Sequence, residues 1–301
     1  MVSKRQADIY VVSPSSAIQD VKLLQKGVER LEKAGFLCKV DSHASAVSTR
    51  FAGTDAQRLA AFNRAIRQAA PIVMASRGGY GVTRLLPQID WRAVADSGKR
   101  FVGQSDFTAF SLALLSQTGM VSFAGPTVCA DFGVSKLNAL TADLFGEVMR
   151  GELEILSFES PDSDTVDCRG ILWGGNLTMV ASLMGTPYMP KVKGGILFVE
   201  DVAEHPYRVE RMLIQLMQSG ILAKQKALVL GNFTDYKLAP HDRGYDLSAV
   251  IKWVRENVGI PIVTGLPYGH TPVKATLPIG KKVGLATEAG MAYLVIDEHT
   301  H

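Results

Sequence analysis

Three residues of the types used in nucleophilic hydrolysis each stand just beyond a short apolar run: Ser105, Glu200 and His270. A serine hydroxyl is a weak nucleophile until an imidazole takes its proton, and a carboxylate holds that imidazole in the correct tautomer. Their order along the chain, Ser–Glu–His, is one that catalytic triads adopt. The three residues therefore form a candidate triad, provided that the fold brings the ends of these runs together.

Ser105 lies in F-V-G-Q-S-D-F-T-A-F at residues 101–110, where an apolar strand gives way to a helix. Gly103 permits a sharp bend, and the helix N-terminus offers N–H groups without internal partners. A hydrolase places its nucleophile at such a turn, although Phe107 stands where the G-x-S-x-G pattern has its second glycine. The alternative is that Ser105 only caps the helix, because serine is a favoured N-cap.

A glycine-rich loop, R-G-G-Y-G at residues 77–81, follows another apolar run. It fits neither the dinucleotide-binding nor the P-loop pattern. Three glycines within four residues indicate a close backbone approach or positive φ angles. The loop is either a plain turn or a source of an oxyanion donor, in which case we expect the N–H groups of Gly79 and Asp106 to act together.

Glu200 and His270 can also be interpreted without any catalytic role. Glu200 ends the apolar run at 196–199 and could cap a helix or lie on the surface. His270 stands between turn residues and could be a loop histidine without function. His205 competes with it for the role of base, but it lies beside a proline and we expect it to be exposed.

Strand-like and helical patterns alternate through the first half of the chain. Such alternation predicts a parallel, doubly wound sheet, in which ligands bind beyond the carboxyl ends of the strands. The glycine-rich loop and Ser105 both belong at that edge. The expected strands are residues 8–12, 36–40, 71–75, 101–102 and 120–124; the expected helices are 21–34, 55–70, one through 85–86, 106–115 and 137–150.

The periodic pattern weakens at residues 151–165, which are rich in Glu, Ser, Pro and Asp. We therefore predict an N-terminal α/β domain at residues 1–152 with the nucleophile, a linker at 153–165, and a smaller C-terminal α/β domain at 166–301 with Glu200 and His270. The active site would lie in the cleft between them. In the second domain we expect strands at 195–200, 227–232 and 262–264, helices at 177–183, 209–219 and 247–258, and a hairpin at 281–296.

Composition excludes several other classes of protein. The chain has 301 residues, 47% of them hydrophobic and 20% charged, and its net charge of +3 is spread without a basic block, which argues against nucleic-acid binding. No stretch approaches the ~20 apolar residues that span a bilayer, and no signal peptide is evident, so we expect a cytoplasmic protein without membrane contacts. The six histidines form no H-x-x-x-H pair, and we expect no metal site.

A set of longer motifs is spread along the chain. The motifs are R-G-G-Y-G at 77–81 with R-L-L at 84–86 and I-D-W at 89–91, G-Q-S-D-F-T at 103–108, W-G-G-N-L at 173–177, V-E-D-V-A-E-H-P-Y-R-V-E-R at 199–211, and G-H at 269–270 with L-P-I-G at 277–280. Together these motifs resemble those of the LD-carboxypeptidases, serine peptidases of peptidoglycan recycling. The similarity extends over nearly the whole chain, and the residue before the serine, Gln104, falls where those enzymes vary.

This resemblance implies a two-domain α/β architecture and a triad of Ser105 as nucleophile, Glu200 as carboxylate and His270 as base. It implies a murein tetrapeptide substrate, cut between the L-centre of meso-diaminopimelate and the terminal D-Ala, with no cofactor, and a homodimer. Arg77 could pair with a substrate carboxylate, since guanidinium forks suit carboxylates, or could form a structural salt bridge.

Two other functions stay open at this stage. The related microcin-immunity peptidases cleave peptidyl- or aminoacyl-nucleotides and carry an extra base-stacking loop in the second domain; the short interval between Glu200 and His270 argues against such a loop here. A protein of another class, a non-catalytic binder of small ligands in an interdomain cleft, would use Ser105 only as a helix cap.

Overall fold

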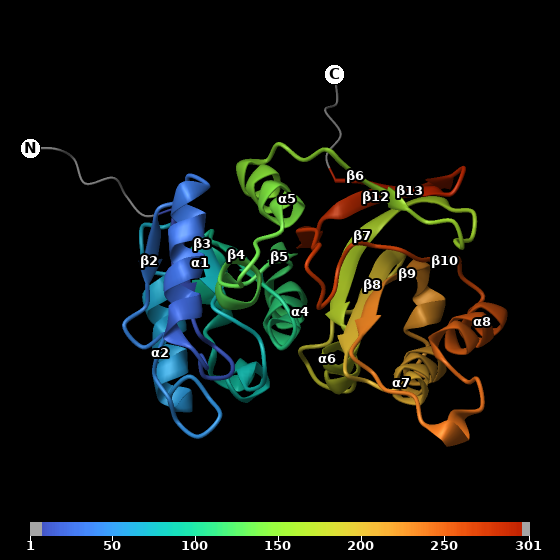
Figure 1. Cartoon of the computed structure of the whole chain (residues 1–301), viewed down its shortest axis with the longest axis horizontal. Coiled ribbons are helices and arrows are strands. Elements are labelled where there is room, and N and C mark those ends of the chain that lie inside the picture. The colour runs from blue at the N-terminus through green and yellow to red at the C-terminus, as the bar shows by residue number, and fades with distance from the viewer. Residues whose placement is uncertain (1–7, 297–301) are drawn as a thin grey trace, which may run out of the picture.

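Two β-sheets lie side by side in the computed structural model, which describes residues 8–296 (Figure 1). One sheet has six strands in the order β11-β5-β4-β3-β1-β2, and the other has seven in the order β10-β9-β8-β7-β12-β13-β6. Helices separate most of the strands along the chain. The predicted fold class, a doubly wound parallel sheet followed by a second α/β unit, is confirmed.

The first sheet is parallel except at one edge. Strands β1 to β5 run parallel to their neighbours, and β11 pairs antiparallel with β5. The strands are β1 (Ile9–Val12), β2 (Cys38–Val40), β3 (Ile72–Ala75), β4 (Arg100–Gly103), β5 (Ser122–Ala124) and β11 (Leu277–Ile279); the helices are α1 (Val21–Lys33), α2 (Asp55–Ala65), α3 (Trp91–Asp96), α4 (Phe107–Thr118) and α5 (Ala139–Arg150).

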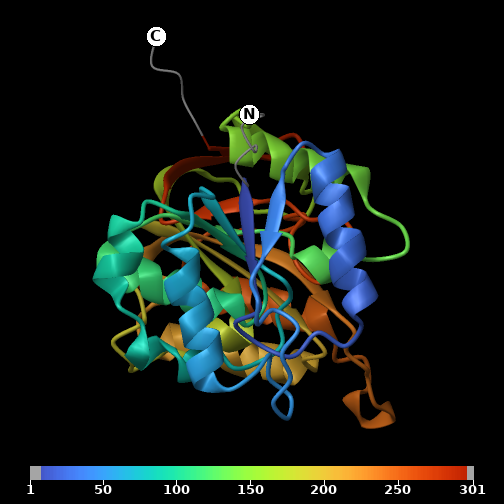
Figure 2. The ribbon, with the colours of Figure 1, turned by 90° about the vertical axis from the view of Figure 1, so that its left-hand side faces the viewer.

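Alternation along β1 explains how helices cover both faces of this sheet. Successive side chains of a strand point to opposite faces. Ile9 and Val11 belong to one core cluster, which also contains the buried side of α1 and of α5, whereas Tyr10 and Val12 belong to the cluster that contains the buried side of α2 and α4. Figure 2 shows α1 and α2 on opposite sides of the strands.

The strand order reverses between β1 and β3, because the chain turns outward from β1 to β2 before crossing to β3. Loops leaving neighbouring strands on the two sides of such a switch point diverge and leave a crevice at the carboxyl ends. Here these loops are residues 13–20 after β1 and the glycine-rich loop at 76–81 after β3. The topology therefore places the glycine-rich loop beside a crevice, next to the turn that follows β4.

The second sheet combines a parallel and an antiparallel half. Strands β7 to β10 are parallel, while β12 pairs antiparallel with β7, and β13 with both β12 and β6. The strands are β6 (Ile155–Glu159), β7 (Asp167–Asn176), β8 (Gly195–Val202), β9 (Gln225–Thr234), β10 (Ile262–Val263), β12 (Lys282–Glu288) and β13 (Met291–Val295); the helices are α6 (Leu177–Ser182), α7 (Pro206–Gln218) and α8 (Leu247–Val258).

Some elements differ from the sequence-based predictions. The helix expected through residues 85–86 is instead two 3-10 turns, Val82–Arg84 and Leu86–Gln88, because Pro87 cannot continue an α-helix. The predicted linker, residues 153–165, contains β6. The glycine-rich strand β7 was not expected. Strand β11 is only three residues long and consists of residues that we assigned to the second domain. It nevertheless pairs with β5 in the first sheet.

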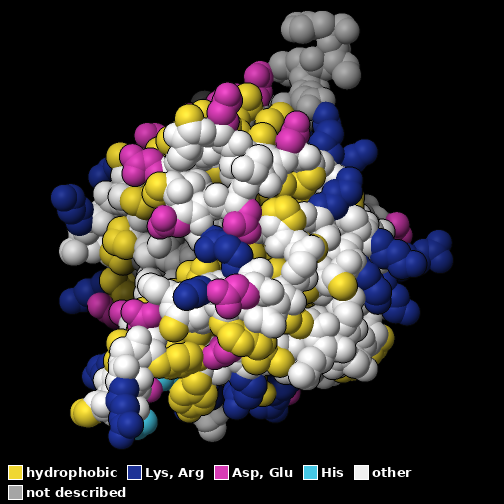
Figure 3. Space-filling model, turned by 90° about the vertical axis from the view of Figure 1, so that its right-hand side faces the viewer, with side chains coloured by type: hydrophobic (Ala, Val, Ile, Leu, Met, Phe, Trp, Pro, Cys, Tyr) yellow, Lys and Arg dark blue, Asp and Glu magenta, His cyan; other side chains and the backbone are white. Residues whose placement is uncertain are grey.

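The outer face of the second half carries charges of both signs (Figure 3). Hydrophobic side chains on this face form small groups separated by polar atoms, without one large apolar patch. Within residues 8–296, no helix combines the length and the apolar content needed to cross a bilayer.

Candidate active site

The turn between β4 and α4 holds Ser105 in an unusual backbone conformation. Its φ angle is +62°, in the left-handed region that costs a residue with a Cβ about 1–2 kcal/mol. Non-glycine residues in this region cluster at functional sites. The N-cap of α4 is Asp106, without a side-chain capping bond, and within residues 8–296 the Ser105 hydroxyl makes no hydrogen bond. The helix-cap interpretation of Ser105 is therefore wrong.

Two glycines allow the backbone to close around this turn. A Cβ on Gly103 would lie 2.5 Å from the ring of Phe107, and a Cβ on Gly78 would lie 2.6 Å from the Ser105 Cβ and 3.0 Å from its Oγ. Real Cβ atoms do not approach other atoms as closely as 2.5 or 2.6 Å, so both positions require glycine. The glycine-rich loop is thus more than a plain turn, since Gly78 packs directly on the serine.

Asp106 joins the glycine-rich loop to the serine turn. Its Oδ2 accepts a hydrogen bond of 2.9 Å from the Val82 N–H, and the carboxyl is 1% exposed. Burial raises the pKa of Asp106 above its ordinary value, although the bond from Val82 acts in the opposite direction. In the described part of the chain, the backbone N–H groups of Gly79 and Asp106 donate to no acceptor. Neither N–H group is therefore occupied by a protein acceptor in residues 8–296, and Gly79 lies in the cavity lining.

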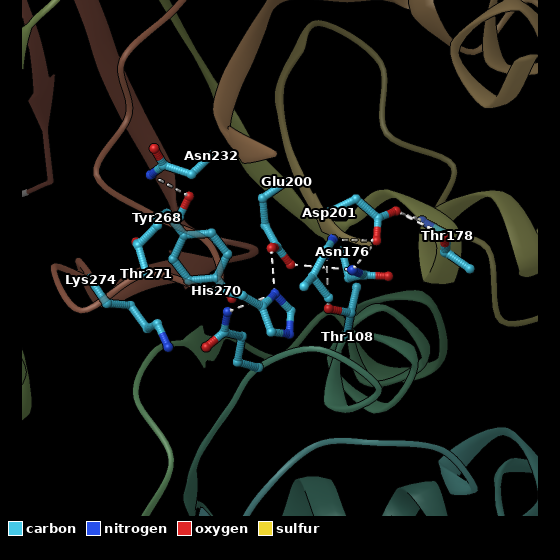
Figure 4. Close-up of polar contacts among 12 residues, drawn as sticks. Thr108, Asn176, Thr178, Glu200, Asp201, Asn232, Tyr268, His270, Thr271 and Lys274 are labelled. Carbon is cyan, nitrogen blue, oxygen red and sulfur yellow. Dashed lines mark hydrogen bonds and ion pairs between the residues drawn. The ribbon is translucent and has the colours of Figure 1, made fainter. Parts of the chain in front are cut away.

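Glu200 and His270 form a close pair. Glu200 Oε2 lies 2.8 Å from His270 Nδ1, and the carboxylate side chain has no solvent exposure (Figure 4). The Gln104 amide is 3.5 Å from the same nitrogen, at the limit of a hydrogen bond, so the carboxylate dominates. A carboxylate on Nδ1 favours the tautomer that carries its proton there, which leaves Nε2 free as a base.

Ser105 and His270 line one cavity of about 610 Å³. Gly78, Gly79 and Arg77 also line it. The Ser105 hydroxyl and the imidazole are not hydrogen-bonded to each other within residues 8–296, a common state before substrate tightens a catalytic site. The structure thus brings Glu200 and His270 into contact and directs Ser105 to the same cavity.

Arg77 keeps its charge available to this cavity. One guanidinium nitrogen donates to the Ala17 carbonyl at 3.0 Å, and among residues 8–296 the side chain makes no ion pair. The structural salt bridge that we gave as the alternative is therefore not formed among the residues that the structure describes.

His205 does not belong to this cavity. Its Nε2 lies 3.0 Å from Asp242 Oδ2, and its ring caps the start of α7 by accepting from the Tyr207 N–H. The side chain is 17% exposed, so the expectation of an exposed histidine is wrong: the contact with the 240–242 turn covers the ring.

Sequence reasoning missed a buried ion pair in the cavity wall. Lys274 Nζ lies 2.6 Å from Asp131 Oδ1, with both side chains at most 5% exposed. Thr127 donates its N–H and hydroxyl to the other Asp131 oxygen, at 2.7 and 3.2 Å. Lys274 follows His270 by four residues, so this pair fastens the histidine loop to the segment after β5. No sequence pattern marked the two residues as partners.

Asn176 was also missed, although it belongs to the W-G-G-N-L motif. It is 5% exposed and donates to Glu200 Oε1 at 3.4 Å (Figure 4). Cys129 also lines the cavity, but burial raises the pKa of its thiol to about 11 and keeps it protonated at neutral pH. Among residues 8–296, no group of three or more His, Cys, Asp and Glu side chains could hold a metal ion.

Two family models match the chain, the LD-carboxypeptidase N-terminal domain over residues 9–125 and the C-terminal domain over 169–285. The crystal structure of muramoyltetrapeptide carboxypeptidase from Oxalobacter formigenes is 46% identical, with a TM-score of 0.91 over 97% of this chain and 99% of that one. The murein tetrapeptide carboxypeptidase of Pseudomonas aeruginosa is 30% identical over 91% of both chains. The microcin C7 self-immunity protein of Escherichia coli is 27% identical over 86% of this chain and 84% of that one. These matches confirm the resemblance of the motifs: the chain belongs to the LD-carboxypeptidase family.

Proposed function

We propose that the protein is a muramoyltetrapeptide carboxypeptidase, a serine LD-carboxypeptidase of peptidoglycan recycling. It hydrolyses the amide between the L-centre of meso-diaminopimelate and the terminal D-Ala and leaves a tripeptide. The observation that carries the proposal is the 2.8 Å pair of Glu200 and His270 in the wall of the cavity that Ser105 enters from its positive-φ turn. The relatives named as murein tetrapeptide and muramoyltetrapeptide carboxypeptidases support a tetrapeptide substrate.

In this mechanism, His270 Nε2 removes the hydroxyl proton as Ser105 Oγ attacks the scissile carbonyl carbon. Glu200 stabilises the imidazolium that forms, and the imidazolium then gives its proton to the departing amine of D-Ala. Water attacks the acyl-enzyme with His270 again as base, which frees the tripeptide carboxylate and restores Ser105. The N–H groups of Gly79 and Asp106 hold the oxyanion; one such donor contributes about 3 kcal/mol.

Arg77 is our candidate for recognition of a substrate carboxylate. Its guanidinium lines the cavity beside Gly78 and Gly79, and it is not neutralised by an acidic side chain in the described part of the chain. A carboxypeptidase has to distinguish a chain end from an internal peptide bond. A fixed cation beside the nucleophile supplies that distinction by pairing with the terminal carboxylate.

Incubation with murein tetrapeptide, followed by mass spectrometry, tests the proposal. We expect loss of one alanine and no loss with the Ser105→Ala protein. A parallel incubation with a peptidyl- or aminoacyl-nucleotide tests the microcin-immunity alternative. Cleavage of the nucleotide conjugate alone would favour that alternative, and binding of tetrapeptide without cleavage would favour a non-catalytic binder.

We further infer that the enzyme works in the cytoplasm as a homodimer, as the family resemblance implies. Sedimentation at micromolar concentration tests the second part, and a species of monomer mass alone would contradict it.

A further inference from the structure

Asn176 stands between two buried carboxylates that are adjacent in sequence. Its Nδ2 donates to Asp201 Oδ1 at 2.9 Å and to Glu200 Oε1 at 3.4 Å (Figure 4). Asp201 is 3% exposed, and its oxygens also accept from the Val202 N–H and from the N–H and hydroxyl of Thr178, at 2.8–2.9 Å. Asp201 is therefore fully hydrogen-bonded, whereas Glu200 has only Asn176 and His270 as side-chain partners in the described part of the chain.

The orientation of the Asn176 amide is determined by its other end. Asn176 is the N-cap of α6, and its Oδ1 accepts from the Met179 N–H at 3.1 Å. An amide whose oxygen caps a helix must turn its NH₂ group the other way, and here that direction leads to the two carboxylates. Asp201 and the helix cap thus hold the donor that reaches Glu200.

The backbone of Asn176 connects this donor to the helix that carries the nucleophile turn. Its N–H donates to Thr108 Oγ1 at 3.1 Å, and the Thr108 N–H donates to the Ser105 carbonyl at 2.9 Å. The approach requires glycine at 175, where φ is +132° and a Cβ would lie 2.6 Å from Thr108 Oγ1. One chain of hydrogen bonds therefore runs from Ser105 through Thr108, Asn176 and Glu200 to His270.

We propose that Asn176 is a positioning residue, which fixes the Glu200 carboxylate and, through Thr108, holds the acid–base pair in register with Ser105. The inference rests on the proposed function of these three residues. Asn176 does not line the cavity, so its loss should leave substrate binding intact while misaligning the groups that react. A displacement of about 1 Å at such a group lowers turnover by about 10²-fold.

The test uses two pairs of variants. Asn176→Ser retains an N-cap oxygen for α6 but removes the donor to Glu200. We expect kcat for the tetrapeptide to fall by about 10²-fold with KM little changed. Thr108→Val removes the acceptor of the Asn176 N–H at nearly constant shape and should also lower kcat, whereas Thr108→Ser retains a hydroxyl and should recover most of the lost activity. Asp246→Ala, which removes the N-cap of α8 outside the site, is the control for capping alone.

A second measurement separates positioning from general destabilisation. In a poorly aligned pair, the hydrogen bond between His270 Nδ1 and Glu200 Oε2 is longer and weaker, so its bridging proton is less deshielded. We expect the downfield ¹H NMR signal of that proton to move upfield or disappear in Asn176→Ser and Thr108→Val, and to stay unchanged in Asp246→Ala. The signal is recorded without substrate. It therefore remains informative even if the wild type fails to cut the tetrapeptide, a result that would count against the proposed function alone. Unchanged kcat in both Asn176→Ser and Thr108→Val, or a fall in kcat with an unchanged downfield signal, would overturn the positioning role.

Discussion

The two sides of the cavity are built by different means. On the nucleophile side, Ser105 is held by backbone geometry: a φ of +62°, a tight bend at Gly103 and the close approach of Gly78. Its hydroxyl has no hydrogen-bond partner within residues 8–296. On the opposite side, Glu200 and His270 are held by a network of side-chain hydrogen bonds among buried polar groups.

The difference shows that the two sides should fail in different ways. A backbone-built turn tolerates changes of polarity nearby but not an added methyl group, because no atom can give way. A network of buried polar groups tolerates small changes of volume but not the loss of a donor, because each unsatisfied group retains its desolvation penalty. The following substitutions address each side in turn.

The largest effect should follow removal of either reacting group. We expect Ser105→Ala and His270→Ala to lower kcat for tetrapeptide cleavage by about 10⁶-fold, because the members of a triad act as a unit. Thermal unfolding of Ser105→Ala should stay close to that of the wild type, whereas His270→Ala, which removes a donor from the buried Glu200, should fold but unfold at a lower temperature. His205→Ala, which removes a histidine outside the cavity, should keep its activity; an essential His205 would refute the assignment of the base.

A smaller loss should follow Glu200→Gln. The glutamine retains the shape of the side chain but presents a neutral amide to His270, which favours the wrong tautomer and leaves the imidazolium unpaired. We expect kcat to fall by about 10⁴-fold, with residual activity above that of Ser105→Ala. Equal kcat values for the two variants would mean that Glu200 does more than orient and stabilise the imidazole.

On the backbone-built side, Gly78→Ala should lower kcat by about 10²-fold, because the new methyl group would displace either Ser105 or the loop over it. Gly98→Ala is the control: unlike Gly78, that glycine has a positive φ, but a Cβ there meets no atom within 4 Å. It should lose some stability and no activity. Full activity in Gly78→Ala would show that the loop moves freely.

Stability gives a finer test of the strain at Ser105. Ser105→Gly should be inactive, like Ser105→Ala, yet have a free energy of unfolding about 0.5–1 kcal/mol higher than the alanine variant. Glycine avoids the penalty of about 1–2 kcal/mol at positive φ, partly offset by the greater freedom of the unfolded chain. Denaturant titration of the two proteins measures the difference, and a less stable glycine variant would argue that the turn is unstrained.

The last prediction concerns the pH dependence of stability at Asp106. Because burial raises its pKa in the folded state, the folded protein binds this proton more tightly than the unfolded chain does. The contribution is fully present below the unfolded pKa of about 3.9 and is lost as pH rises through the higher folded pKa. Asp106→Asn keeps an acceptor for the Val82 N–H but cannot ionise. Its stability relative to the wild type should increase from pH 4 to pH 7 in thermal unfolding, and a decrease would contradict the burial argument.

The sequence by itself determined the fold class and the nucleophile turn. Hydrophobic periodicity and glycine position are local properties, so the alternation of strands and helices and the sharp bend before Ser105 could be predicted from neighbouring residues. The same locality explains the failures. Strand β11, three residues long with Pro278 in the middle, carries too little local pattern, and its place beside β5 depends on a partner far away in the chain.

Apart from the family resemblance, nothing in the sequence indicated which acidic residue meets which histidine, and the tertiary structure decided it. Glu200 and Asp201 are neighbours at the end of β8, where the pairing with β9 shifts register between Val199 and Asp201. A shift of register changes which side chain faces which side of a sheet, and no local pattern predicts it. Contact with His270 for one carboxylate, and with Thr178 and Asn176 for the other, arises from packing between distant segments. The residue types indicated the chemistry of a serine hydrolase. Contacts between segments far apart in the chain determined which carboxylate pairs with the histidine.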